Sequence, residues 1–258
     1  MKIIKGIISV MLLLAASSAA AEADTVLTTV VRPVTSSYTI GIGSAHQANT
    51  YLTPLKYEGI ASSLNYERWQ AMKFSPKQWV MRMAFMLNVD KTQNPARNAT
   101  MWYVGIQASW SMMHRWNLNE ALTLGAGPAT SLELGCLYNR RNGNNPAQAN
   151  ASWMIGGEAY ATYKLNIRSL PVTLGYHASV PLTGAFFTPQ YGELYYEIYL
   201  GDHSGLAHWG WWGNYFAIHN QFTADLHFGA TAMRLGFQLD YTTTAANHIT
   251  TRSTRYMF

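Results

Sequence analysis

Cysteine and charge are both scarce in this sequence. Cys136 is the only cysteine, so no intrachain disulfide can form, and we expect no lipid-modified cysteine near the N-terminus. Charged residues make up 12% of the chain, whereas a water-soluble domain of this size usually carries about a quarter. The net charge of +5 is too weak to indicate a nucleic-acid partner. The composition therefore argues against an ordinary soluble domain.

Long apolar runs are also missing. The apolar stretch 7–16 follows Lys2 and Lys5 and precedes the small residues Ala19-Ala20-Ala21. This arrangement is typical of a cleaved signal peptide, and the stretch is shorter than the 18 or so residues that a transmembrane helix needs. We therefore expect export, with a signal peptide over 1–21 and an N-terminal periplasmic segment over 22–33.

Apolar residues instead recur at every second position, over 78–89, 102–112, 172–180 and 233–241. Such alternation places them on one face of a β-strand. The other face is rich in glycine, serine and threonine, which suit a crowded barrel interior, whereas tryptophans near strand ends suit a lipid-facing surface. The pattern predicts an all-β fold, an antiparallel transmembrane β-barrel over 34–258 in a bacterial outer membrane. A soluble barrel, with its apolar face inside, is the alternative.

Turn signals predict about ten strands, with long external loops alternating with short periplasmic turns, as in outer-membrane barrels. Twelve strands is the alternative, because a turn at 125–128 would raise the count and 193–200 also resembles a strand. The terminal Phe258 falls where the tenth strand closes the barrel, and outer-membrane barrels resemble one another in ending on an aromatic residue that the assembly machinery reads. The expected strands are 34–45, 58–69, 78–89, 101–112, 117–138, 152–165, 171–181, 213–226, 231–242 and 250–258.

Three segments, 138–147, 181–193 and Asn247-His248, resemble the signatures of an uncharacterised family of exported bacterial proteins, a domain of unknown function. The resemblance covers most of the chain after the predicted signal peptide. It implies export and a β-rich fold, but the family has no assigned activity that could be expected of this chain. These segments lie mainly in the predicted external loops, where barrels usually keep their specificity.

His177 and Ser179 lie two residues apart on one face of a predicted strand. Outer-membrane phospholipases and lipid A deacylases use a similar His-x-Ser pair, with histidine as the base for a serine nucleophile. In this register both side chains face the lumen rather than lipid. A structural pair is therefore the favoured interpretation, and catalysis by His177 and Ser179 is the alternative.

Charged residues also fall on the inward face. A ten-stranded barrel is narrow enough for side chains to fill, so we expect these charges to pair and block the lumen. A selective polar passage is the alternative. The predicted lumen network comprises Glu67, Arg82, Glu133, Glu158, Lys164, Asp225, Arg234 and Asp240, with Arg255 beside them.

Two predicted loops carry candidate ligand-binding residues. Loop 139–151 holds Arg140, Arg141, Asn144 and Asn145, and guanidinium groups suit the phosphates of lipopolysaccharide. An ordered turn, in which Asn and Gly adopt unusual backbone angles, is the favoured interpretation there, and phosphate binding is the alternative. Loop 182–212 is rich in aromatic residues, which predicts a packed lid, or else contact with sugars or membrane. Its candidates are Tyr191, Glu193, Trp209 and Trp212.

These observations favour a non-enzymatic surface-binding or structural protein of the outer membrane. A lipid hydrolase and a narrow selective channel are the alternatives. We expect outer-membrane lipid, lipopolysaccharide and the barrel-assembly machinery as partners, and no cofactor. His203 and His208 are too irregularly placed to predict a metal site. The sequence does not specify a ligand.

Overall fold

The structure is a computed structural model that describes residues 32–143 and 145–258. The predicted signal peptide lies outside the described residues, as does the N-terminal segment up to residue 31. In the described part of the chain, helices that could span a membrane are absent.

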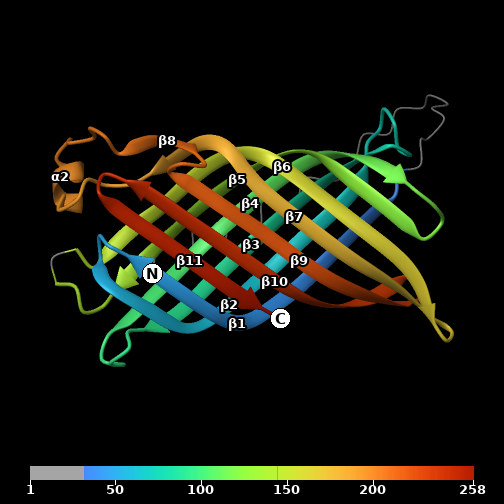
Figure 1. Ribbon diagram of the computed structural model, residues 1–258, viewed down its shortest axis with the longest axis horizontal. Helices are drawn as coiled ribbons and strands as arrows, with labels where there is room; N and C mark the ends of the chain where they lie inside the picture. Colours follow the sequence, from blue (N-terminus) through green and yellow to red (C-terminus); the bar gives the residue numbers. More distant parts are fainter. Residues whose placement is uncertain (1–31, 144) are drawn as a thin grey trace, which may run out of the picture. The chain divides into compact units, whose positions relative to one another are not determined.

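The chain forms a closed antiparallel β-barrel of ten strands, which confirms the predicted fold class and strand number. Neighbours in sequence pair in order, and β1 pairs with β11 to complete the wall, as Figure 1 shows. The short β8 adds to β7 as an extra strand. The strands are β1 (Val34–Asn49), β2 (Thr53–Ala71), β3 (Trp79–Gln93), β4 (Thr100–Asn117), β5 (Leu122–Asn139), β6 (Ala147–Ile167), β7 (Leu170–Phe187), β8 (Ala207–Trp211), β9 (Tyr215–Phe228), β10 (Thr231–Ala246) and β11 (Ile249–Met257).

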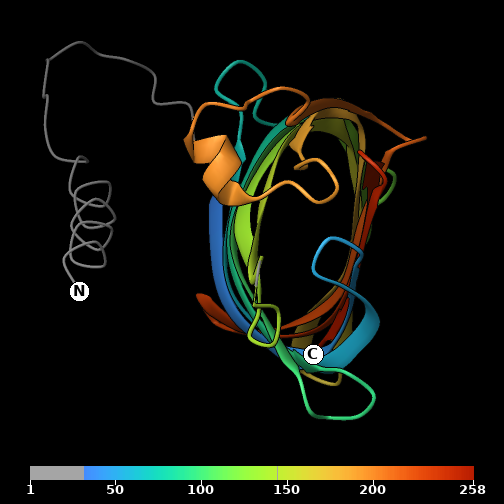
Figure 2. The same ribbon diagram turned by 90° about the vertical axis from the view of Figure 1, so that its left-hand side faces the viewer.

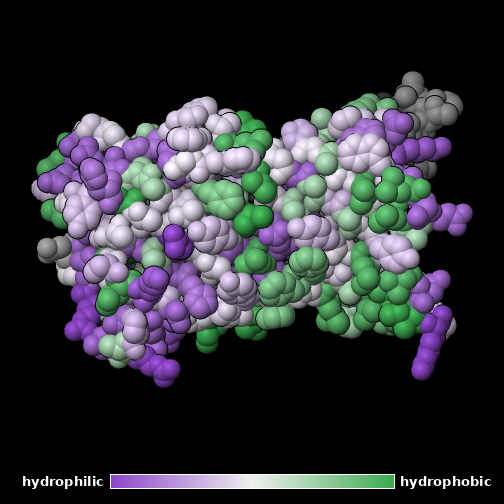
Figure 3. All heavy atoms as spheres, in the orientation of Figure 1, coloured by the Kyte–Doolittle hydropathy of each residue, from purple (hydrophilic) through white to green (hydrophobic). Residues whose placement is uncertain are grey.

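The two faces of the wall differ as the alternation predicts. Apolar side chains such as Ile40, Leu64 and Leu235 are exposed on the outside. Charged side chains such as Glu67 and Arg82 are buried inside. Figure 3 shows hydrophobic side chains over the strands and more hydrophilic ones at the end of the barrel where α2 (Tyr195–Tyr199) lies. We call the end that carries α2 the loop end and the opposite end the turn end.

Glycines in the wall make room for large inward side chains. A Cβ on Gly125 would lie 2.2 Å from the ring of Tyr160, and one on Gly105 would lie 2.1 Å from the hydroxyl of Tyr103. Each ring therefore lies flat against the wall only because its neighbour has no side chain. This is why segment 125–128 continues as part of β5 instead of forming the turn that was the alternative.

The predicted boundary between the fourth and fifth strands was wrong. The expected strand 117–138 begins too early. β4 ends at Asn117, a turn follows, and β5 begins at Leu122. Asn119 makes the intervening turn by accepting hydrogen bonds from the backbone N–H groups of Ala121 and Leu122. Segment 193–200 lies in the connection between β7 and β8, as expected, and it contains α2 and not the strand of the twelve-strand alternative.

Most of the predicted long loops are shorter than expected. Strands continue past the apolar band into polar sequence, so the connections shrink to 50–52, 94–99, 140–146 and 247–248. Asn247 and His248 have φ of 50° and 62°, the left-handed conformation that a two-residue hairpin requires. Only the connection 188–206, which contains α2, remains long. It lies at the rim of the barrel mouth and partly over it (Figure 2).

Candidate functional site

An ion-paired cluster crosses the lumen, and most of its members lie toward the turn end of their strands. Arg82 donates from Nε to Glu67 Oε1 at 2.5 Å, and its Nη1 lies 3.3 Å from Glu158 Oε1. These three residues come from β3, β2 and β6, so the contacts reach across the barrel. All three are buried. We call this cluster, with Arg234, Asp225 and His177, the lumen network.

Arg234 extends the lumen network to the closing strands. Its guanidinium donates to both oxygens of Asp225, at 2.7 and 2.8 Å, and to Glu67 Oε2 at 2.7 Å. It also donates to Ser37 Oγ at 3.1 Å. A fork of this kind matches a carboxylate in two places, so it fixes geometry as well as charge. Arg234 on β10 is thereby tied to β9, β2 and β1.

A second set of charges lies nearer the loop end. Arg255 donates to Asp90 at 2.8 Å and stacks over the ring of Tyr103, with its Cζ 4.6 Å from the ring centroid. Asp240 accepts from His219 and from Gln238. Asp90 took no part in the predicted network, although it shares the inward parity of Asn88. The alternation in 78–89 ended one residue too early to include it.

The remaining predicted lumen residues behave differently. Glu133 makes no ion pair among the described residues, but it accepts hydrogen bonds from the Tyr103 hydroxyl at 2.6 Å and the Asn150 amide at 3.2 Å. Lys164 is exposed at the turn end of β6 and forms no ion pair in the part of the chain described. Its inward parity is as expected, but its position along the barrel places it beyond the network.

His177 and Ser179 both face the lumen, and they do not contact each other by hydrogen bond in the described structure. His177 Nε2 instead lies 2.6 Å from Glu158 Oε1, and its ring is 6.3 Å from that of Trp69. A histidine that acts as the base for Ser179 would have to direct a ring nitrogen at the Ser179 hydroxyl. The observed contact makes His177 a member of the lumen network, and among the described residues no hydrogen bond joins Ser179 to a histidine.

A small cavity lies between the lumen network and the loop end. Its volume is about 90 Å³, and Glu158, His177, Ser179, His219 and Asp240 line it together with Tyr215. The cavity is therefore polar and large enough for a few water molecules. Within the described residues, no group of three or more histidine, cysteine, aspartate or glutamate side chains is placed to hold a metal ion.

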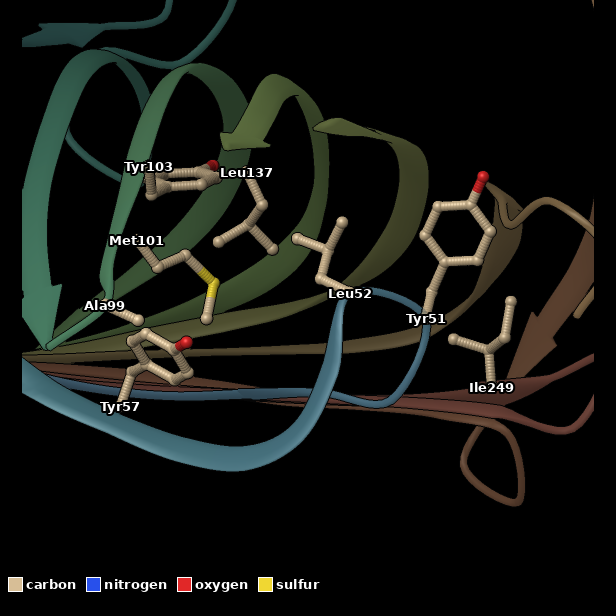
Figure 4. Packing of buried hydrophobic residues seen from close by; sticks show 8 residues of the cluster. All are labelled: Tyr51, Leu52, Tyr57, Ala99, Met101, Tyr103, Leu137 and Ile249. Carbon is tan, nitrogen blue, oxygen red and sulfur yellow. The ribbon is translucent and has the colours of Figure 1, made fainter. Parts of the chain in front are cut away.

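An apolar cluster fills the lumen at the loop end, and sequence analysis did not predict it. The β1–β2 turn folds inward, so that Leu52 points at Met101 and Leu137 (Figure 4). Tyr51 lies on the same turn and donates from its hydroxyl to the backbone oxygen of Glu193 at 2.6 Å. We call this group the mouth cluster; it comprises Tyr51, Leu52, Tyr57, Ala99, Met101, Tyr103, Leu137 and Ile249.

The mouth cluster holds part of segment 188–206 in place. Tyr195 packs against it, and the Tyr195 hydroxyl accepts a hydrogen bond from the backbone N–H of Ala149 at 2.6 Å. Burial raises the pKa of Tyr195 to about 12 and also raises that of Tyr51. Both phenols are therefore held in the neutral form. The apolar pair Tyr51-Leu52, within an otherwise polar connection, was the feature of the sequence that could have predicted this inward fold.

The predicted ligand-binding residues of loop 139–151 are only partly brought together. Arg140 and Arg141 are exposed at the loop end, and Arg141 lies beside the neighbouring connection 94–99, with Nη1 3.5 Å from the Asn98 oxygen. Asn145 instead donates to the Glu193 backbone oxygen at 3.2 Å. Asn144 lies outside the described residues.

The aromatic residues of segment 182–212 form the favoured packed lid only in part, because Tyr195 packs against the mouth cluster whereas the tryptophans stay exposed. Trp209 lies on β8 and is 69% exposed, and Trp212 is 58% exposed with its Nε1 donating to the Pro181 oxygen. They face outward because β8 pairs with the wall at β7. Tyr191 is exposed too, whereas Glu193 is buried and accepts from the Gln190 N–H at 2.7 Å.

One comparison with known proteins identifies the family. The model of a family described as a protein of unknown function (DUF3316) matches residues 7–258. The chain belongs to this family. The match confirms the uncharacterised family that the sequence resembles. No curated protein matches the chain, and no solved structure does.

Proposed function

We propose that this DUF3316 protein is an outer-membrane β-barrel with a closed lumen, which presents binding or shielding surfaces at its loop end. The observation that carries the proposal is the orientation of the wall. Ile40, Ile106 and Leu235 are 74%, 47% and 56% exposed, while the charges of the lumen network are buried. Exposed apolar side chains all around a barrel suit hydrocarbon far better than water.

The same orientation suggests how the ends are placed. The turn end carries short connections such as 118–121, 168–169 and 229–230, and the loop end carries α2 and the longest connection. Outer-membrane barrels keep short turns in the periplasm and long loops outside. The rings of Tyr38 and Tyr66 lie against each other, tilted by 38°, on the outer face toward the turn end, with ring centroids 4.9 Å apart. Trp209 and Trp211 face outward at the loop end, so both rims carry aromatic residues of the kind that sit at membrane interfaces.

Two independent obstructions support a closed lumen. The lumen network crosses the barrel, and the mouth cluster fills the loop end. A general pore would need a continuous aqueous path, so we propose a structural or binding role in preference to conduction.

At the loop end, the exposed Arg140 and Arg141 offer guanidinium groups to phosphate. Lipopolysaccharide is therefore the surface ligand that we propose for them. The test is co-purification of lipopolysaccharide with the native protein and with the double variant Arg140→Ala/Arg141→Ala. A phosphate-binding role predicts a lower lipopolysaccharide content in the double variant, and equal content would contradict it.

The membrane location is tested by fractionation. The full-length protein should sediment with outer membranes, need detergent for release, and migrate faster on unheated than on heated gels. Reconstituted in planar bilayers, it should give no large steady channels. Recovery as a detergent-free periplasmic monomer would contradict the location, and large steady conductance would contradict the closed lumen.

A lipid hydrolase is the competing function. Acyl release from phospholipid and lipid A should be absent, and Ser179→Ala and His177→Ala should leave the measured background unchanged. Release that both substitutions abolish would overturn the non-enzymatic proposal.

A further inference from the structure

The wall of the barrel is incomplete beside the last strand. Pairing between β1 and β11 begins at Ile42, which exchanges backbone hydrogen bonds with Phe258 at 3.0 Å. Pairing between β10 and β11 begins at Gln238, opposite Met257. On this side, residues 34–41 of β1 and 231–237 of β10 have no strand partner within the described residues. Figure 1 shows β11 ending at the label C while β10 continues toward the turn end.

This opening is bounded at both ends, so it is a window rather than a slit. The Ile42–Phe258 pair closes it toward the loop end. Toward the turn end, the Arg234 side chain crosses from β10 to Ser37 on β1. A cavity of about 250 Å³ lies between, and we call it the window; its lining includes Thr39, Ile40, Asn65, Gln221, Leu235 and Phe258.

The window has an apolar outer rim and a polar inner wall. Ile40, Leu235 and Phe258 are 74%, 56% and 76% exposed on the outer face. Inside, Asn65 Oδ1 has no hydrogen-bond partner among the described residues, and the Gln221 amide makes no hydrogen bond there either. The lining therefore changes from hydrocarbon-like to hydrogen-bonding within one cavity.

Arg234 separates the window from a further part of the lumen nearer the turn end. A second cavity of about 180 Å³ lies there, lined by Trp69, Tyr160 and Thr173. It shares Gln221, Thr223 and Arg234 with the window. A molecule that enters the window from the side would therefore meet Gln221, Thr223 and the Arg234 guanidinium at its inner end.

We propose that the window binds a phospholipid of the surrounding bilayer, an inference that rests on the proposed membrane location. An acyl chain lies between Ile40, Leu235 and Phe258, and the ester and phosphate oxygens reach the inner wall. Backbone N–H groups at the unpaired edges cannot be satisfied by hydrocarbon. Lipid oxygens are acceptors, so they can take hydrogen bonds from these N–H groups and from the side-chain amide of Gln221. A purely apolar ligand would leave the edges unsatisfied.

The test measures whether lipid acyl chains reach the inside of the wall. In a Cys136→Ser background, Gln221→Cys carries a bimane fluorophore, and the barrel is placed in phosphatidylcholine vesicles with brominated acyl chains. Leu87→Cys, on the outer face, reports membrane insertion. Ser109→Cys, which lines the cavity on the loop side of the network, reports the sealed lumen. We expect loss of fluorescence at positions 87 and 221 and none at 109.

A filling substitution checks that quenching at position 221 depends on the window. Thr39→Trp places a large ring in it, and Thr242→Trp places the same ring in the lumen on the loop side of the network. Thr39→Trp should abolish quenching at 221 and leave that at 87 unchanged, whereas Thr242→Trp should alter neither.

Three outcomes would overturn the proposal. An unquenched position 221 beside a quenched position 87 would leave the barrel in the membrane and exclude lipid from the window. Quenching at 221 that appears only after deletion of residues 22–31 would assign the window to that segment of the chain. If position 87 is not quenched, both the membrane location and the lipid site fail.

Discussion

Arg82 contacts carboxylates from two other strands and is 7% exposed. Removing one partner of a buried ion pair is costly because the opposing charge stays buried without compensation. Glu67 keeps its ion pair with Arg234 when Arg82 is lost, whereas the one ion-pair partner that Glu158 keeps among the described residues is His177. Most of the stability lost with Arg82 therefore comes from the buried charge of Glu158, which is left without an arginine partner.

Arg82→Ala should lower the free energy of unfolding by about 3–5 kcal/mol. Urea unfolding of the vesicle-embedded barrel, followed by tryptophan fluorescence, measures this. Lys164→Ala is the matched control, because Lys164 is exposed at the turn end, and its effect should stay within about 0.5 kcal/mol. Equal stabilities for the two variants would show that the lumen network contributes nothing.

Parity alone predicted which charged residues face inward, because a strand alternates its faces whatever its surroundings. It could not predict which of them meet. Lys164 and Glu158 share a strand and a face, yet only Glu158 reaches Arg82. Their heights along the barrel depend on the stagger of all ten strands, and no single segment of sequence contains that information.

The connections between strands also depend on neighbours that a single segment of sequence does not reveal. Segment 193–200 alternates well enough to resemble a strand, but it has no pairing partner and contains α2 instead. Polar strand ends were read as loops because they lack the apolar alternation of the middle of the wall. The inward fold of Tyr51-Leu52 depends on residues far apart in sequence, such as Leu137 and Ile249.

The attachment of segment 188–206 can be tested through Tyr51. Tyr51→Phe removes the hydrogen bond to the Glu193 oxygen, at a cost of about 1 kcal/mol. We expect faster cleavage of this segment in limited proteolysis, with the strands still protected. Tyr191→Phe should not change the rate, since Tyr191 is exposed. Equal cleavage rates would mean that Tyr51 does not hold the segment.

Alkaline pH should loosen the same region. Burial raises the pKa of Tyr195 to about 12 in the folded protein, whereas an unfolded tyrosine titrates near 10. Between these values the unfolded chain loses the proton first, so stability that is complete below pH 10 declines as the pH rises toward 12. The slope of unfolding free energy against pH over this range should be shallower for Tyr195→Phe. An unchanged slope would contradict a buried neutral phenol.

For the whole molecule, the outward apolar surface makes a prediction that separates a membrane barrel from a soluble one. Leu64 faces outward and is 53% exposed. In a bilayer, Leu64→Arg should destabilise the barrel by about 2–4 kcal/mol. Thr250→Arg, exposed near the loop end, should cost about 1 kcal/mol or less. Urea titration in vesicles measures both. Equal effects of the two substitutions would argue against a lipid-facing wall.

The pairing of β1 with β11 also has a kinetic consequence. Gly43 meets Met257, so the contact that seals the cylinder joins residues from opposite ends of the chain. Contacts between such distant residues form slowly, because ordering the intervening chain costs entropy before the contact repays it. Until β11 pairs with β1, the barrel is an open sheet with two unpaired edges. The time before closure then sets how long these edges can pair with other chains and aggregate.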